Sequence, residues 1–346
     1  MKALVLEGVK KLVLRDVPRP SCADDGIVIK VMANGVCRSD WHKWMGHYQR
    51  RSDPIILGHE FCGVVEEVGS RIVRFKPGDR VIVPVSGSDG TCDHCKSGHS
   101  NLCDSYLVPG IAYNGGFAEY VAVPVADRNA EFLPDNISYA EASSLGCRFI
   151  TSYHALVDRA TVQLGDWVAV FGCGGVGLAA INIASAMGAN VIGVDINQGN
   201  LDFAKQLGAK VAINSDALDP IAEIKRITNG GADVSMDALG HQITCLQGIN
   251  SLKKGGRHVQ VGITTNTREG DVPMPITDMV HNEISFYGSL GIPVYEMKKL
   301  LALVAQGVVK PGKTLAGEIS LEEVVPVFER MEKESITGSY VVTKFN

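Results

Sequence analysis

The segment from Trp167 to Asp195 constrains the possible folds of this chain more than any other. An apolar run, WVAVF, leads into a glycine-rich stretch, which is followed by the helical pattern LAAINIASAMG and a second apolar run, VIGVD. The glycine-rich stretch consists of Gly172, Cys173, Gly174, Gly175, Val176 and Gly177. Strand, glycine turn, helix and strand in this order predict a βαβ unit, whose two strands lie parallel in one sheet.

The rest of the chain falls into parts with different periodicity. From about residue 165 to 290, six short apolar runs alternate with helical patterns, enough for one doubly wound parallel sheet, an α/β Rossmann fold. Residues 1 to about 148 carry short alternating runs such as KALVLE and GIVIKVM, which predict a mostly β domain. We therefore expect domains at 1–148 and 149–287, with the C-terminal segment 288–346 returning to the first.

The glycine-rich turn is also a candidate binding site. Its glycines allow a close approach of the backbone to a pyrophosphate, and the following helix offers unpaired N–H groups and the positive end of its dipole. Asp195 ends the next strand, 18 residues after Gly177, where a carboxylate can accept hydrogen bonds from ribose hydroxyls and would repel a 2′-phosphate. The motif predicts NAD as a cofactor. The alternative is a plain strand–turn–helix with a surface aspartate.

The cysteine content and the charge limit which cellular compartment and which partners can be expected. The nine cysteines are an odd, uneven set with one C-x2-C pair, which favours metal ligation in a reducing compartment, by default the cytoplasm, over a disulfide framework. The formal net charge is -5 and no long run of like charge occurs, so we expect no nucleic-acid partner and no polybasic membrane surface. No apolar run approaches the length of a membrane span.

Three residues far apart in the sequence form a candidate metal set. Cys37 lies in CRSDWH, His59 lies in GHE, and Cys147 lies in SSLGCRF. Each residue alone is weak evidence, because a free cysteine is most often a small buried apolar residue. Together, two thiolates and one imidazole match a zinc site with three protein ligands and an open position, which is the layout of a catalytic zinc.

The order CRSDWH, GHE, a zinc-type cysteine, GCGGVG and then an aspartate resembles the zinc-dependent medium-chain alcohol dehydrogenases over nearly the whole chain. The resemblance implies a GroES-like catalytic domain, a Rossmann domain and an active site in the cleft between them. It also implies NAD-dependent interconversion of an alcohol with its aldehyde or ketone, and a homo-oligomer, a tetramer or dimer. The alternatives are a polyol, sugar or threonine dehydrogenase of the same superfamily, or a non-enzymatic relative that binds zinc and a nucleotide.

The same resemblance assigns roles to single residues. The catalytic zinc ligands are Cys37, His59 and Cys147, with Glu60 as a transient ligand. Asp40 orients the zinc-bound His59, and Ser39 and His42 form a proton relay. The cofactor contacts outside the glycines are Arg38, Thr151, Val176, Asp195 and Val261. The substrate pocket would be lined by Trp41 or Trp44, Tyr48, Phe149 and Leu290, unless these side chains belong to the core.

A second cysteine group lies at about 86–105. Cys92, Cys95 and Cys103 suit a structural zinc, but such a zinc usually has four ligands. The family's structural lobe uses four ligands with spacing x2, x2, x7, normally all cysteine, and Asp89 stands at the first position here. Asp89 is thus our expected fourth ligand, His94 and His99 are its rivals, and a lobe without metal is the remaining alternative. We expect two zinc ions per chain.

Overall fold

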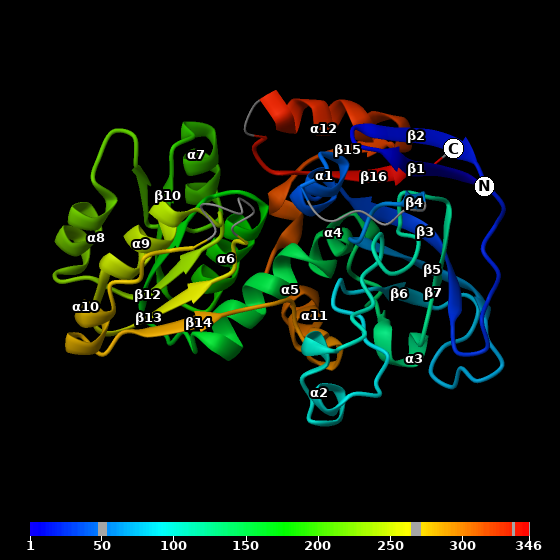
Figure 1. Cartoon of the computed structure of the whole chain (residues 1–346), viewed down its shortest axis with the longest axis horizontal. Helices are drawn as coiled ribbons and strands as arrows, with labels where there is room; N and C mark the ends of the chain where they lie inside the picture. Colours follow the sequence, from blue (N-terminus) through cyan, green and yellow to red (C-terminus); the bar gives the residue numbers. More distant parts are fainter. Residues whose placement is uncertain (48–53, 264–270, 334–335, 346) are drawn as a thin grey trace. The chain divides into compact units, whose positions relative to one another are not determined.

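The computed structural model describes residues 1–47, 54–263, 271–333 and 336–345. The chain forms two compact units: Met1–Ile150 together with Gly291–Asn346, and Thr151–Leu290. Figure 1 colours the chain along its sequence, so that the C-terminal segment can be followed from the second unit to the strands of the first.

The unit 151–290 is built on one six-stranded parallel sheet. Its strand order is β11-β10-β9-β12-β13-β14, so the first strand is central and the chain winds outward in both directions. The strands are β9 (Trp167–Phe171), β10 (Asn190–Asp195), β11 (Val211–Asn214), β12 (Ala232–Asp237), β13 (Leu252–Gln260) and β14 (Ser285–Gly288). All six expected strands are present, and the doubly wound fold is confirmed.

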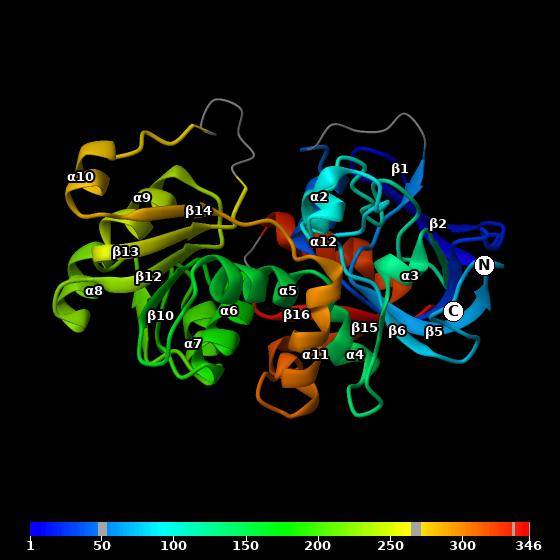
Figure 2. The same cartoon turned by 90° about the horizontal axis from the view of Figure 1, so that it is seen from below.

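Helices cover both faces of this sheet. Helices α6 and α7 contact each other and the strands β9 to β11, whereas α8 and α9 contact each other and β12. Figure 2 shows α6 and α7 on one side of the strands and α9 on the other. The helices are α6 (Gly175–Ala186), α7 (Gln198–Gln206), α8 (Pro220–Thr228), α9 (Gln242–Asn250) and α10 (Ile276–His281). Strands such as WVAVF are apolar throughout because both faces are covered.

The glycines between β9 and α6 meet different surroundings. A Cβ at Gly177 would lie 1.8 Å from the carbonyl oxygen of Gly172, so only glycine allows this close approach of helix and turn. A Cβ at Gly174, the N-cap of α6, would meet nothing within 4 Å. The sequence therefore leaves open space in front of the first turn of α6.

The other unit contains two β-sheets. One has the order β15-β16-β3-β5-β6-β8 with β7 also paired to β3, and the other has the order β2-β1-β4. The strands are β1 (Lys2–Gly8), β2 (Lys11–Asp16), β3 (Ile27–Gly35), β4 (Ile55–Ile56), β5 (Phe61–Val68), β6 (Arg80–Ile82), β7 (Tyr120–Val123), β8 (Glu131–Phe132), β15 (Leu315–Ser320) and β16 (Ser339–Lys344). Because β16 pairs with β3, the C-terminal strand is part of the sheet formed by the N-terminal residues.

Short helices connect these strands and close the core. Phe61, Phe117 and Phe328 are fully buried in one cluster together with Trp44. The helices are α1 (Arg38–Trp44), α2 (Asp93–Lys96), α3 (Ala126–Asn129), α4 (Tyr139–Ser143), α5 (Arg148–Tyr153), α11 (Met297–Ala305) and α12 (Val324–Lys333). The candidate metal ligands lie in the short connections just after β3, just before β5 and just before α5.

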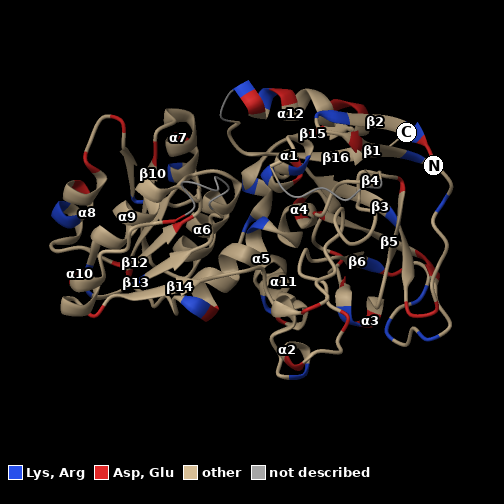
Figure 3. Ribbon diagram, in the orientation of Figure 1, with Lys and Arg blue, Asp and Glu red and all other residues tan. Residues whose placement is uncertain are grey.

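Charged residues of both signs occur throughout the described chain. Lys and Arg residues are interspersed with Asp and Glu residues along the ribbons of both units (Figure 3). Among the described residues, no helix is both long and apolar enough to span a membrane.

Candidate active site

Four side chains from separate segments come together in what we call the buried cluster: Cys37, His59, Glu60 and Cys147. Each offers one ligand atom, and these atoms all lie within 4.8 Å of one another. Cys37 is the N-cap of α1, His59 and Glu60 directly precede β5, and Cys147 directly precedes α5. The three sequence segments that were expected to supply a zinc site therefore meet in space.

The imidazole of His59 is held in one orientation by Asp40. Nδ1 of His59 lies 3.0 Å from Oδ1 of Asp40, and the backbone N–H of Gly58 donates to the same oxygen at 3.1 Å. Burial acts to lower the pKa of His59, but attraction by Asp40 and then Cys37 outweighs it and raises this pKa to about 10. The other ring nitrogen, Nε2, is buried and has no hydrogen-bond partner among the described residues. A buried ring nitrogen without a hydrogen-bond partner is a suitable position for a metal ion, which would take the place of a proton there.

The two thiols of the cluster also suit a metal. The hydrogen bond from Cys147 lowers the pKa of the Cys37 thiol well below its usual range. A thiolate next to a second thiol and an unpartnered imidazole nitrogen is a donor set that fits zinc. The residues present thus fit the metal that the sequence predicted.

An arginine that the sequence analysis did not single out lies against the cluster. Arg148 donates from Nε to Oε1 of Glu60 at 2.9 Å, its Nη2 pairs with Oε2, and its backbone N–H reaches Oε1 at 3.3 Å. Burial raises the pKa of Glu60 to about 7, against the opposing effect of Arg148. One signal was available, because Arg148 is the one Lys, Arg, Asp or Glu residue in the run SSLGCRFITSYHAL.

The space for this ion pair depends on Gly35, the last residue of β3. A Cβ at Gly35 would lie 2.2 Å from Oε2 of Glu60 and 2.8 Å from Nη2 of Arg148. The N–H of Gly35 also donates to the carbonyl oxygen of Glu60 at 2.8 Å. Any larger residue at position 35 would push the carboxylate or the guanidinium out of place.

The expected relay residues lie on α1. The Sγ of Cys37 is 3.8 Å from the Oγ of Ser39, so Ser39 borders the buried cluster. Nδ1 of His42 contacts Nδ1 of His47 at 2.9 Å. Burial, then repulsion by His47 and Arg38, lowers the pKa of His42 to about 4.

Arg38, the expected pyrophosphate contact, is engaged within its own unit. It donates from Nη1 to the carbonyl oxygen of Met331 at 2.8 Å, and its guanidinium lies over the ring of Trp41, 4.6 Å from the centroid. These contacts fix the side chain against helices α1 and α12.

The second cysteine group, here called the lobe cluster, consists of Cys92, Cys95 and Cys103, whose sulfur atoms lie within 4.8 Å of one another. Oδ1 of Asp89 accepts a hydrogen bond from the Cys103 thiol at 3.3 Å, and the backbone N–H of Thr91 donates to the same oxygen at 2.9 Å. The bond from Thr91 is the main cause that lowers the pKa of Asp89 to about 2. The rival ligands, His94 and His99, are exposed.

Asp195 ends β10 beside the glycine-rich turn. Its Oδ2 accepts the backbone N–H of Cys173 at 2.7 Å, and its Oδ1 accepts the N–H of Asn197 at 2.8 Å. Val176 lies in the first turn of α6, where its carbonyl oxygen accepts from Ser152 Oγ at 2.8 Å. The carboxylate, the turn and the open helix N-terminus form the arrangement expected of a dinucleotide site.

Comparison with known proteins decides the family. Residues 23–133 match the family model "Alcohol dehydrogenase GroES-like domain", and residues 175–306 match the model "Zinc-binding dehydrogenase". An alcohol dehydrogenase of Geobacillus stearothermophilus is 37% identical over 99% of this chain and 98% of its own length. The chain belongs to the zinc-dependent alcohol dehydrogenase family.

Other relatives cover the chain equally fully. The NAD-dependent alcohol dehydrogenase of Sulfurisphaera tokodaii is 35% identical over 99% of both chains. The solved structure of the alcohol dehydrogenase TADH from Thermus sp. ATN1 superposes with a TM-score of 0.92 at 29% identity, again over 99% of both chains.

The remaining expected residues of this alcohol dehydrogenase differ in their surroundings. Trp44 and Phe149 are buried in the core, where Trp44 packs on Phe328 with ring centroids 5.6 Å apart. Leu290 is 45% exposed, and Tyr48 lies outside the described residues. Two expected nicotinamide contacts, Thr151 and Val261, are both partly buried in the unit 151–290.

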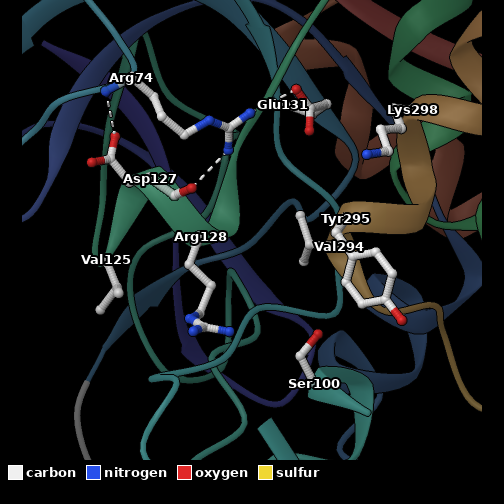
Figure 4. A pocket seen from close by; sticks show the side chains of 9 residues that line it. All are labelled: Arg74, Ser100, Val125, Asp127, Arg128, Glu131, Val294, Tyr295 and Lys298. Atoms are coloured by element: carbon white, nitrogen blue, oxygen red, sulfur yellow. Dashed lines mark hydrogen bonds and ion pairs between the residues drawn. The ribbon is translucent and has the colours of Figure 1, made fainter. Parts of the chain in front are cut away.

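A pocket of about 570 Å³ lies elsewhere in the first unit of the alcohol dehydrogenase (Figure 4). Arg74 pairs there with Glu131 at 2.8 Å and donates to the backbone carbonyl of Asp127 at 2.6 Å. Arg128 and Lys298 also line it, but none of the residues of the buried cluster does. Neither of the two groups of potential metal ligands found among the described residues lines this pocket.

Proposed function

We propose that this member of the family is an NAD-dependent zinc alcohol dehydrogenase that interconverts an alcohol with its aldehyde or ketone. The observation that carries the proposal is the buried cluster, in which His59, whose Nε2 is unpartnered among the described residues, and two thiols place their ligand atoms within 4.8 Å of one another. Cys37, His59 and Cys147 would hold the metal. When bound, zinc supplies Lewis-acid polarisation of the substrate oxygen and NAD supplies the hydride acceptor.

The residues around the cluster have separate tasks in this proposal. Asp40 fixes the tautomer and orientation of His59, so that Nε2 keeps its lone pair. Ser39 Oγ, beside Cys37, accepts the proton of the substrate hydroxyl while its own hydroxyl proton moves on toward His42. His42, further along α1, is the group that receives a proton from this relay. Its low pKa keeps the ring neutral near pH 7, ready to accept.

Glu60 remains our proposed transient ligand of the metal, but its ion pair with Arg148 limits when it can bind. Both carboxylate oxygens of Glu60 are paired with the Arg148 guanidinium. Glu60 therefore reaches the metal position only when this ion pair opens. Between such events, the pair neutralises a buried carboxylate that would otherwise repel the thiolates.

The cofactor preference proposed for the enzyme is NAD over NADP, because of Asp195. A 2′-phosphate at hydrogen-bonding distance would meet a like charge, a repulsion on the order of several kcal/mol before screening. Residues 196–200, Ile-Asn-Gln-Gly-Asn, offer no cation to offset it. The variant Asp195→Gly should narrow the preference for NAD over NADP, mainly by weakening the binding of NAD, and the added substitution Asn197→Arg should raise the use of NADP.

Measurement of kcat/KM with NAD and with NADP tests this cofactor preference. If the parent enzyme used both cofactors, the proposal would be contradicted.

The lobe cluster is proposed to hold a second, structural zinc with Asp89 as its fourth ligand. The contact between Asp89 and the Cys103 thiol supports this choice, since it places a carboxylate, a possible zinc ligand, beside one of the three thiols. All nine cysteines are free thiols, which is consistent with a reducing compartment such as the cytoplasm. A homotetramer or dimer remains our proposal for the assembly.

The substrate class is proposed to be simple alcohols. Polyol enzymes of the superfamily usually carry a glutamate in place of the third cysteine ligand, and this chain has Cys147 there. The test is NADH formation with a panel of simple alcohols and polyols, and the reverse reaction with aldehydes and ketones, each with and without a metal chelator. We expect turnover of simple alcohols that the chelator removes. Binding of NADH without turnover of any substrate would instead favour a non-enzymatic relative.

A further inference from the structure

Two histidine rings at the end of α1 contact each other through like atoms. Nδ1 of His42 and Nδ1 of His47 are 2.9 Å apart, which is a hydrogen-bonding distance. The backbone N–H of His47 also donates to the carbonyl oxygen of His42 at 2.9 Å. Trp41 packs edge-on against both rings, at centroid distances of 5.0 Å and 5.4 Å. The pair is therefore fixed by the backbone and by a shared aromatic neighbour.

A contact between two imidazole Nδ1 atoms has a definite proton requirement. One ring must carry N–H and the other must offer its lone pair, so the contact holds one proton that belongs to either ring. Each ring then has its Nε2 on the far side. His42 is partly buried, whereas His47 is exposed, so the contact leads from the interior of α1 to the solvent.

We infer that His47 is the exit of the proton relay: a proton that reaches His42 is passed through the Nδ1–Nδ1 hydrogen bond to His47 and released to water from there. This inference rests on the proposed role of His42. In alcohol oxidation, an N–H bond forms at Nε2 of His42 while its Nδ1–H bond breaks toward Nδ1 of His47. The Nε2–H bond of His47 then breaks toward a water molecule. Both rings end neutral, and aldehyde reduction runs these steps in reverse.

The surroundings explain why His42 needs such a partner. Its pKa is lowered to about 4, first by burial and then by His47 and Arg38, so a full positive charge on its ring is disfavoured. The charge of Cys37 acts to raise the pKa of His42, but its effect is smaller. On the packed helix α12, Glu332 is ion-paired with Lys10. A concerted transfer avoids a long-lived imidazolium at His42, because the proton that arrives at one nitrogen is matched by one that leaves from the other.

The test compares His47→Gln, His42→Gln and a matched control, His281→Gln, which removes an exposed histidine in the last turn of α10. The pH profile of NADH formation is measured for each holoenzyme, in weak buffer and with added imidazole. We expect His47→Gln to lower the rate roughly tenfold or more below the pH optimum, with recovery by imidazole and little change at high pH. The control should match the parent.

A second measurement does not depend on turnover. Ring-nitrogen NMR of the holoenzyme should show the pKa of His42 rise in His47→Gln, because the repulsion from His47 is gone. The exit role of His47 would be overturned if His47→Gln left both the pH profile and the pKa of His42 unchanged while His42→Gln altered the pH profile. The proposed role of His42 would then still stand. If His42→Gln also keeps the parent profile, the proposed relay through His42 fails and His47 has no role in it.

Discussion

The two cysteine sites of this enzyme are built in different ways. The buried cluster gathers Cys37, His59 and Cys147 from three separate segments within residues 37–147, next to α1, β5 and α5; Cys37 and His59 are buried and Cys147 is partly buried. The lobe cluster takes Cys92, Cys95 and Cys103 from twelve consecutive residues, which contain only a single turn of α2 and a short 3-10 helix.

The difference indicates what each site needs from its metal. The buried cluster is shaped by the fold and by the Asp40 and Arg148 contacts, so we expect it to keep its geometry without metal. The lobe has little regular structure of its own, so its order should depend on the metal. Metal loss from the first site should therefore remove activity, and loss from the second should reduce stability.

The largest expected effect is at the buried cluster. Cys37→Ser should lower kcat by roughly a thousandfold or more, because several kcal/mol of charge stabilisation are lost with the metal. NADH binding, measured by fluorescence, and the folded state should be retained. Cys62→Ala, which removes a nearby buried thiol outside the cluster, is the control. Near-normal turnover by a metal-free Cys37→Ser enzyme would exclude the zinc mechanism.

The next effect concerns stability, with Cys37, His59 and Cys147 left unchanged. Arg148→Gln should reduce the free energy of unfolding by about 3–5 kcal/mol, because it leaves the buried Glu60 without its partner. The double variant with Glu60→Gln should recover much of this loss. Arg226→Gln, which breaks an exposed pair with Glu223, should change the free energy of unfolding far less, because solvent screens this pair. Urea unfolding measures all three, and equal losses for Arg148→Gln and Arg226→Gln would contradict the idea that the fold shapes this site.

A smaller effect is expected from the residue that orients the histidine ligand. Asp40→Asn should speed zinc loss to a chelator about 10- to 100-fold, because the His59 ring loses its charged partner. The lobe zinc of the same protein is the internal control, and its rate of loss should not change. If both zinc ions leave faster, the substitution has loosened the whole unit and not the buried site.

The smallest effect on activity is expected in the lobe. Asp89→Ala should lower the zinc content from two to one per chain and lower Tm by several degrees, with kcat close to that of the parent. The neighbouring Asp93→Ala, at a fully exposed side chain, is the matched control. A parent enzyme with one zinc, together with unchanged Tm in Asp89→Ala, would show that Asp89 is not a ligand.

The parts of the fold that depend on local pattern could be predicted from the sequence. Strand β9, WVAVF, is an uninterrupted apolar run because helices cover both faces of the sheet, and the six strands alternate with helical patterns. The turn before α6 could be assigned because its backbone leaves no space for a side chain at a defined position. A Cβ at Gly177, for example, would clash with the carbonyl oxygen of Gly172.

The parts of the site that depend on tertiary contacts could not be predicted from the sequence. Arg148 meets Glu60 across a sequence separation of 88, and nothing in the sequence pairs them. Gly35 appears as an ordinary glycine at the end of a strand until the ion pair beside it is seen. His47 follows α1 in sequence, but the direction of its ring toward His42 is set by the chain reversal after the helix and by Trp41.

The spacing of the lobe thiols has a consequence for how the enzyme survives in air. The sulfur atoms of Cys92 and Cys95 are 3.6 Å apart, and a disulfide needs them at about 2 Å, a small closure for a loop. The N–H groups of Asp104 and Cys95 lower the pKa of Cys92, which makes its thiolate easier to oxidise. A bound metal ion would occupy these sulfur lone pairs. Zinc in the lobe would thus protect these thiols from oxidation. Protein from which the metal is removed in the presence of oxygen should lose the ability to bind zinc again.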